Sequence, residues 1–312
     1  MTSYVLKRLT HIIPVLIATT LLVFALLSLS PSDPAQLILG VGAKPEELAQ
    51  MREQLGLNDP LLVRYARYMG GVLTGDFGTS YSTKRPVLEM IGVRLPNTLV
   101  LAFGSLALIL IVAIPLGVAL AVRQNTLFDN VMRVLTLLTA AMPSFWLGLM
   151  LILLFSVKLG WLPSSGLDNV RAAIMPLVCL AVAGWTVTSR LTRASMLDVV
   201  RQDYIRTARA KGLPQGVVMR KHALRNALLP VVTSVGLLVG QSVGGAVVIE
   251  ILFGINGIGK MMVDAVRQQD VPTIMGGVLI AAVVIAVANL LTDLSYAVID
   301  PRLESMYGEP AA

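Results

Sequence analysis

Long apolar runs alternate with shorter polar segments along this chain of 312 residues. Six runs are each long enough for a helix to cross a bilayer, which takes about 20 residues. They lie at residues 12–29, 98–122, 131–157, 172–189, 228–251 and 273–298. The first run follows Lys7 and Arg8, but it is too long for a signal peptide and no small-residue cleavage site precedes Pro31. The pattern therefore predicts an all-α integral membrane protein with six transmembrane helices, the first of them retained.

Positive charge gathers in one connection between apolar runs. Residues 190–225 contain nine Lys or Arg against only Asp198 and Asp203, whereas residues 158–171 contain two cations. Short loops rich in Lys and Arg stay in the cytoplasm, so residues 190–225 are predicted to be cytoplasmic. Six crossings then place both termini in the cytoplasm and residues 31–94 outside.

Composition narrows the possible functions. Only 14% of the residues are charged and 55% are apolar, whereas about a quarter of an ordinary soluble domain is charged, so a soluble enzyme is excluded. The net charge of +7 could suit nucleic acid, but Tyr204 is the only aromatic residue among the clustered cations, and a stacking platform needs several. We expect no nucleic-acid partner. Cys179 is the only cysteine, which excludes an intrachain disulfide and a cysteine-based metal site.

The outer connection is too long for a plain linker. Proline and acidic residues at 44–47 predict a helix that ends near Gly56; further short helices are expected at 60–73 and 86–94, with a turn at 75–80 between them. This segment is either a cap over the helix ends or a docking surface for an external protein.

Small residues mark one face of the fifth apolar run. Gly236, Gly240 and Gly244 recur at four-residue spacing, which lets another helix approach closely in lipid. The alternative is that these glycines line a path for cargo.

Ionisable residues inside the runs are few. Glu250 lies near the outer end of the fifth run and Asp293 near the inner end of the sixth, with no deep Lys or Arg to pair with them. We expect Asp293 to be structural. A carrier coupled to protons or sodium usually shows carboxylates or broken helices at mid-membrane. An ion-coupled secondary transporter or channel that acts without ATPase subunits is therefore kept only as the alternative function.

Residues 254–260 match the phosphate-loop pattern G-x-x-x-x-G-K by letter alone. Met261 stands where the pattern needs Ser or Thr, and the preceding residues end an apolar helix instead of a buried strand. No paired carboxylates, nucleophile elbow or metal-binding cluster stands out in the sequence. We expect no catalytic residue, resident cofactor or metal in this chain.

The cationic connection has the pattern of a short helix followed by a longer one. Asp203 to Lys211 should be helical, with an acid in the first turn and Gly212 and Pro214 ending the helix. A second helix should start near Gln215 and run into the fifth apolar run. From the residues alone, docking in a groove of a cytoplasmic protein and anchoring to anionic lipid are equally supported.

Residues 206–212, with Leu229 and Pro230 downstream, resemble the EAA loop of permease subunits of bacterial binding-protein-dependent ABC importers, and the longer run at 203–212 resembles one branch of that family more closely. The dipeptide/oligopeptide/nickel branch, with its DppB/OppB-type permeases, is the most similar; further matching motifs lie at residues 75–81, 94–98, 143–146, 250–253, 257–259 and 300–302. Arg206 stands where the general family has its name-giving glutamate, a departure that the branch shares. Residues 254–256 also depart, since the branch more often has an aromatic-proline pair there.

The resemblance implies a type I (MetI-like) permease fold, with a five-helix core, an N-terminal helix and a long external loop. The corresponding segments are the first helix at 1–30, the external loop at 31–94, the permease domain at 95–298 with its coupling loop at 190–227, and a cytoplasmic tail at 299–312. The chain would be a permease subunit of an ATP-driven importer in the bacterial inner membrane, forming half of the path for peptides. Relatives also carry nickel chelates, haem, glutathione and sugars, so the cargo stays open.

The resemblance also implies partners and roles. A second, DppC/OppC-type permease, two ABC ATPase subunits that hold ATP and Mg²⁺, and an external solute-binding protein would complete the importer. Coupling to the ATPases would fall to the short cytoplasmic helix, with Gly212 as its fixed bend; its residues are Asp203, Tyr204, Arg206, Thr207, Ala208, Arg209, Lys211 and Gly212.

Overall fold

The computed structural model describes residues 2–29, 33–40 and 42–299. These residues are helical except for turns and one isolated bridge between Thr79 and Pro86, so the predicted all-α fold is confirmed. They divide into two compact units: unit 1 holds residues 99–255 and 287–299, and unit 2 holds residues 2–98 and 256–286. The matching motif at 300–302 and the side chains of Lys7, Arg8 and Asp293 lie outside the described part.

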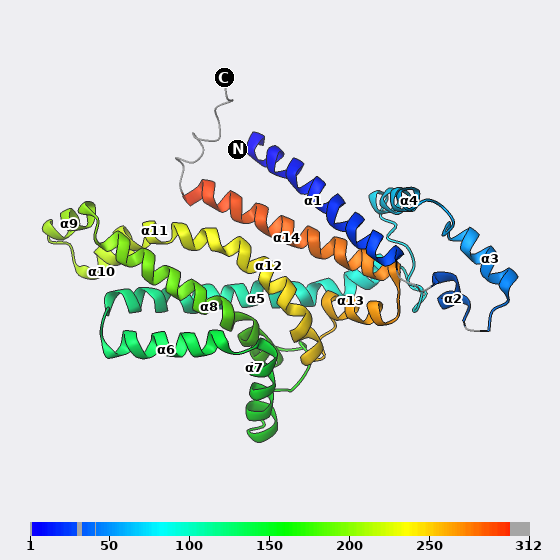
Figure 1. The fold of residues 1–312 in the computed structure, drawn as a ribbon. Helices are drawn as coiled ribbons and strands as arrows, with labels where there is room; N and C mark the ends of the chain where they lie inside the picture. The colour runs from blue at the N-terminus through cyan, green and yellow to red at the C-terminus, as the bar shows by residue number, and fades with distance from the viewer. Residues whose placement is uncertain (1, 30–32, 41, 300–312) are drawn as a thin grey trace. The chain divides into compact units, whose positions relative to one another are not determined.

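Unit 1 contains the middle of the chain (Figure 1). Its helices, in chain order, are the second part of α5 (Val87–Val122), α6 (Leu127–Ala141), α7 (Ser144–Leu151), the π-helix η1 (Ile152–Lys158), α8 (Val170–Val200), α9 (Asp203–Ala210), α10 (Gln215–Val217), the π-helix η2 (Val218–Ala223), α11 (Leu224–Ala227), α12 (Leu229–Leu252) and the end of α14 (Val271–Ile299). The long helix α8 packs against α6, α7 and α12 and is the centre of the unit.

Unit 2 contains the first helix and the outer connection. It comprises α1 (Thr2–Ser28), α2 (Pro34–Leu39), α3 (Pro45–Gln54), α4 (Leu61–Leu73), the first part of α5, α13 (Ile258–Arg267) and the first part of α14. Phe24 of α1, Tyr65 of α4 and Met275 of α14 are buried together in one core cluster.

Within the described part of the chain, five helices are long and apolar enough to cross a membrane: α1, α5, α8, α12 and α14. The third predicted crossing, residues 131–157, is not one straight helix, because α6 and the α7–η1 segment meet at a bend of 102° (Figure 1). Met142 between them is extended, with φ −82° and ψ 125°. Pro143 explains this conformation, since a proline disfavours the helical region for the residue before it. The bent pair provides the sixth span if it crosses as a unit.

The outer connection contains the expected helices at 45–54 and 61–73, and Gly56 has the left-handed φ of +63° expected after a helix end. The short α2 was not predicted. The expectation of a separate helix at 86–94 was wrong, because α5 runs without interruption from Val87 through Pro96. Packing overrides the proline signal: Val87, Met90 and Ile91 are buried against α13 in one apolar cluster.

Candidate functional site

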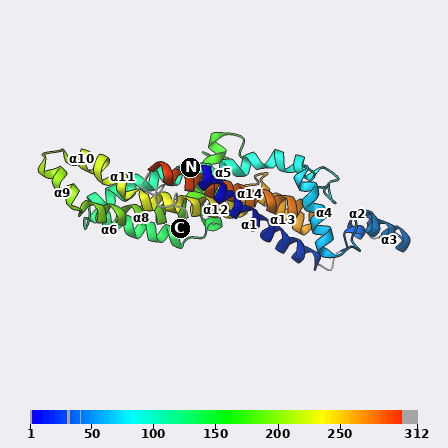
Figure 2. The same cartoon turned by 90° about the horizontal axis from the view of Figure 1, so that it is seen from above.

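Helix α9 forms as the sequence predicts. Asp203 lies in its first turn and Arg209 in its last, where each charge complements the helix dipole. Gly212 follows with φ +74°, a left-handed conformation that costs other residues about 1–2 kcal/mol. Figures 1 and 2 both place α9 at one extremity of unit 1, beyond the ends of α8 and α11. The chain thus turns back sharply at this point.

The inner face of α9 is anchored in an apolar core. Ile205 is fully buried and Ala208 is 7% exposed. Both belong to a cluster with side chains from α5, α8 and the α10–α11 segment; its other buried members are Ala121, Met196, Val218, Met219, Ala223 and Ala227. Ala208, which the sequence suggests for coupling, therefore holds the helix in place and is turned away from any docking partner.

The outer face of α9 is polar and open. Arg206 and Asp203 form an exposed ion pair with a distance of 3.5 Å from Nη1 to Oδ1. Thr207 and Arg209 are exposed beside them, as is Lys211 after the helix. Tyr204 is 42% exposed, and its hydroxyl oxygen accepts a hydrogen bond of 2.7 Å from Asn226 Nδ2. The structure thus brings the remaining predicted residues together at one end of the unit.

The arm that returns to the membrane is helical but irregular. The expected helix begins at Gln215 and passes through α10, η2 and α11 into α12, where Pro230 stands in the first turn. The π-helical η2 carries the cations Arg220 and Lys221, both exposed. Val218 and Ala223 of the same turn are fully buried in the core that holds α9. α9 is therefore supported from both arms.

The glycine face of α12 has mixed surroundings within unit 1. A side chain at Gly236 would meet Asn289 Oδ1 at 3.0 Å and Thr292 Cγ2 at 3.5 Å on α14, so this glycine does permit close helix packing. Gly240 is half-buried, and Gly244 is exposed with no atom within 4 Å of such a Cβ. Glu250 is fully buried, and its backbone oxygen accepts a hydrogen bond from Ile255 N at 2.8 Å.

Sequence reasoning missed one buried ion pair. Asp129, in the first turn of α6, is fully buried and accepts hydrogen bonds from Arg193 of α8, at 3.0 Å from Nε and 2.8 Å from Nη2. The signal in the sequence is an acid near the start of an apolar run with Arg133 four residues later. Only the fold brings Arg193 close to it. Among the described residues, no group of three or more His, Cys, Asp or Glu could hold a metal ion.

Relatives match almost the whole chain. The oligopeptide transport system permease protein AppB of Bacillus subtilis (strain 168) is 42% identical over 315 residues, covering 97% of this chain and all of that protein. The dipeptide transport system permease protein DppB of Alkalihalophilus pseudofirmus is 39% identical over 97% of this chain and 100% of its own. The glutathione transport system permease protein GsiC of Salmonella paratyphi A is 43% identical over 97% of this chain and 99% of its own.

The fold is also found among solved structures. The MetNI methionine ABC transporter in inward-facing conformations contains a chain with a TM-score of 0.56 and 19% identity, covering 68% of this chain and 96% of that one. A family model described as the binding-protein-dependent transport system inner membrane component matches residues 113–305, and the model of its N-terminal part matches residues 1–102. This chain therefore belongs to the family of inner membrane components of binding-protein-dependent transport systems.

Proposed function

We propose that this chain is one of two permease subunits of an ATP-driven importer and forms half of the path for peptides. Peptide cargo is supported by the relatives, which are named for oligopeptides, dipeptides and the tripeptide glutathione. An external binding protein delivers the peptide, a second permease of similar fold completes the path, and two cytoplasmic ATPase subunits hold ATP and Mg²⁺. The cluster of cations at residues 190–225 supports a cytoplasmic position for α9 and both termini.

The observation that carries this proposal is that α9 has one apolar face, which is buried, and one polar face, which is exposed. A helix that merely lay on anionic lipid would turn an apolar face outward, into the bilayer surface. In α9 the apolar side chains Ile205 and Ala208 are buried within the protein, while Arg206 and Arg209 are exposed. This arrangement leaves no apolar face on α9 for insertion into the bilayer surface and presents a cationic face that suits an acidic groove of a cytoplasmic protein.

Rigid attachment of α9 supports a role in coupling. The helix shares its core with the ends of α5 and α8 and with the arm that enters α12. A movement of the ATPases that displaces α9 is therefore transmitted to spanning helices and is not absorbed by a loose loop. Gly212 fixes the direction in which the chain leaves the helix, since its φ of +74° is one that side-chain-bearing residues rarely adopt.

The test is reconstitution in liposomes with the second permease, the ATPase subunits and the external binding protein, followed by uptake of a labelled dipeptide. Uptake should need ATP, and the double change Arg206→Glu with Arg209→Glu should lower it at least about tenfold, because like charges at a docking surface repel. Lys158→Glu, an exposed cation at the end of η1, is the matched control and should leave uptake unchanged.

Two results would contradict the proposal. One is full ATP-driven uptake by the α9 double variant. The other is uptake by this chain alone, driven by a proton or sodium gradient, which would favour an ion-coupled carrier.

A further inference from the structure

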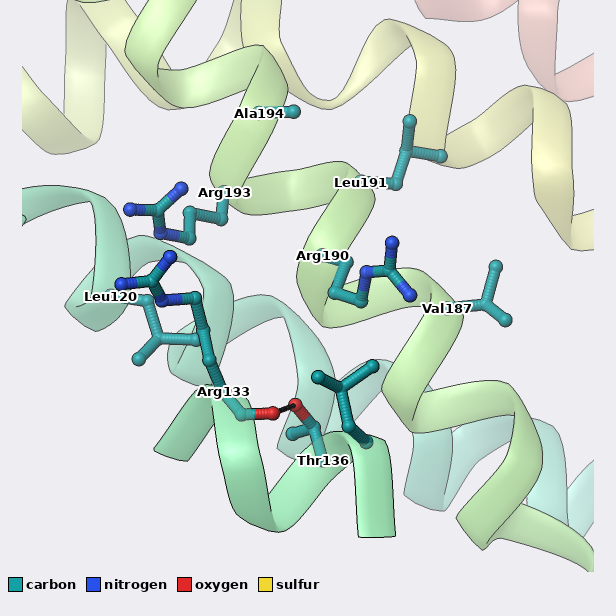
Figure 3. A pocket seen from close by; sticks show the side chains of 9 residues that line it. Leu120, Arg133, Thr136, Val187, Arg190, Leu191, Arg193 and Ala194 are labelled. Atoms are coloured by element: carbon teal, nitrogen blue, oxygen red, sulfur yellow. Dashed lines mark hydrogen bonds between the residues drawn. The ribbon is translucent and has the colours of Figure 1, made fainter. Parts of the chain in front are cut away.

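A cleft of about 620 Å³ lies between α6 and α8 in unit 1 (Figure 3). Three arginines line it: Arg133 from α6, and Arg190 and Arg193 from α8. Arg190 and Arg193 are one helical turn apart on the same face of α8, and Figure 3 shows Arg133 extending from α6 toward Arg193. None of the three lies on the exposed face of α9, whose cations are Arg206 and Arg209.

The charges in this cleft do not balance. Asp129 takes both hydrogen bonds of Arg193 and lies 3.6 Å from Nε of Arg133. Arg190 is exposed and makes no ion pair with any residue in the described part of the chain. Three cations against one carboxylate leave the cleft with a formal charge of +2. An anionic ligand would complement this excess of positive charge.

The walls of the cleft are apolar and open. Leu137 on α6 is 54% exposed and Val187 on α8 is 58% exposed, and both line the cleft with Leu191. Leu137 and Val187 belong to the apolar runs at residues 131–157 and 172–189, so acyl chains suit them and a small soluble anion would make no contact with them. Arginines beside apolar walls thus favour a ligand with a charged headgroup and hydrocarbon chains.

The depth of the arginines fits the same ligand. Arg190 and Arg193 follow directly on the apolar run at residues 172–189 of α8, so they lie where hydrocarbon gives way to headgroups. Arg133 lies two turns into α6, at the same end of the α6–α8 pair. Basic pockets between membrane helices at this level suit the phosphates of anionic lipids.

We propose that the cleft between α6 and α8 is a binding site for an anionic phospholipid. Its phosphate lies between Arg133 and Arg190, and its acyl chains lie along Leu137 and Val187. The ion pair of Arg193 with Asp129 positions α6 against α8 and keeps the cleft open at this width. Asp129 also limits the charge: one phosphodiester headgroup lowers the formal charge of the cleft from +2 to +1, and the two phosphates of cardiolipin balance it fully.

The test measures lipid retained by the full chain, purified together with any subunits that accompany it, in nanodiscs that contain phosphatidylglycerol, cardiolipin or phosphatidylcholine. Native mass spectrometry counts the bound lipids. Arg190→Gln should weaken phosphatidylglycerol or cardiolipin binding roughly fivefold, and adding Arg133→Gln should weaken it about fivefold again. Arg171→Gln is the matched control, because Arg171 is an exposed cation at the other end of α8. Arg193 is left unchanged, because its loss would break the ion pair with Asp129 and weaken the packing of α6 on α8.

The expected pattern is a selective loss of anionic lipid in the Arg190 and Arg133 variants, with phosphatidylcholine unaffected and the Arg171 control equal to the wild type. Equal retention of anionic lipid in all four proteins would overturn the proposal. Displacement of the bound lipid by millimolar inorganic phosphate or by a short acidic peptide would also overturn it, because the site would then serve a soluble anion. All variants should keep the elution profile and helical content of the wild type.

Discussion

Arg193→Met removes the two hydrogen bonds that Arg193 donates to the buried carboxylate of Asp129 and leaves the one from Asn125 N at 3.0 Å, while the replacement retains the apolar stem of the side chain. The arginine is 18% exposed and the aspartate 0%, so the pair is largely shielded from water in the folded chain. Breaking one partner out of a buried ion pair costs about 3–5 kcal/mol. Arg133, whose Nε lies 3.6 Å from Asp129 and which is 45% exposed, compensates in part, and we therefore expect a loss at the low end, about 3 kcal/mol.

The double variant Asp129→Asn with Arg193→Met separates the charge from the contact. It leaves no buried ion, so the free energy of unfolding should fall by only about 1 kcal/mol. The single variant Asp129→Asn completes the cycle, and the coupling energy between the two sites should be at least about 2 kcal/mol in magnitude. The measurement is equilibrium unfolding of the purified chain in mixed micelles with increasing SDS, followed by helical circular dichroism.

Arg171→Met is the control for this experiment. Arg171 is exposed near the start of the same helix, and its replacement should change the free energy of unfolding by less than about 0.5 kcal/mol. The reasoning is refuted if Arg193→Met costs no more than Arg171→Met, or if the coupling between positions 129 and 193 is near zero.

Three further changes test other parts of the structure. Gly212→Ala should lower the free energy of unfolding by about 1–2 kcal/mol, because the residue has a positive φ, and it should lower cargo-stimulated ATP hydrolysis of the reconstituted complex. Gly212→Asn should have a smaller effect on both. Wild-type activity in both variants would contradict the role of the bend. Gly117→Leu should lower the free energy of unfolding of the isolated chain by about 1–3 kcal/mol, because its Cβ would lie 2.7 Å from the Ser189 carbonyl oxygen. Gly244→Leu is the control and should be neutral, because a Cβ there would meet nothing within 4 Å. An equal loss of stability in the two variants would argue against close packing at Gly117. Asp270→Ala removes the acceptor for Tyr81 N at 3.0 Å and for the Ser80 hydroxyl. A hydrogen bond to a carboxylate contributes about 1.5–3 kcal/mol, so protease should cleave the turn at residues 78–86 at least about tenfold faster. An unchanged rate of cleavage would show that Asp270 does not hold the turn.

Local signals in the sequence predicted several elements because short-range chemistry alone determines them. Pro45 with the acids after it begins α3, and Gly56 and Gly212 follow helix ends with the left-handed φ that glycine permits. The acid in the first turn and the cation in the last turn of α9 complement the helix dipole. The candidate docking helix could thus be located from the sequence to within one residue of its ends.

Prolines and glycines at helix–helix contacts could not be interpreted in the same way. Pro143 accompanies a bend of 102° whereas α5 continues through Pro96, and the difference is that apolar packing on α13 supports the first part of α5. The spacing of Gly236, Gly240 and Gly244 predicted a packed face; α14 does meet Gly236, but Gly244 is open. Proline and glycine permit a bend or a close approach; their neighbours decide whether it occurs.

The sequence by itself determined that this protein is helical, spans a membrane several times and carries a short cationic helix between two of its spans. Hydrophobic run length, charge placement and capping residues are local properties, so they need no knowledge of the fold. Only the tertiary structure decided which face of α9 is buried, and only it joined Asp129 to Arg193 across 64 positions of the chain. Both depend on which helices pack together, because a side chain's partner and its access to water are set by surfaces from distant segments and not by its own neighbours in sequence.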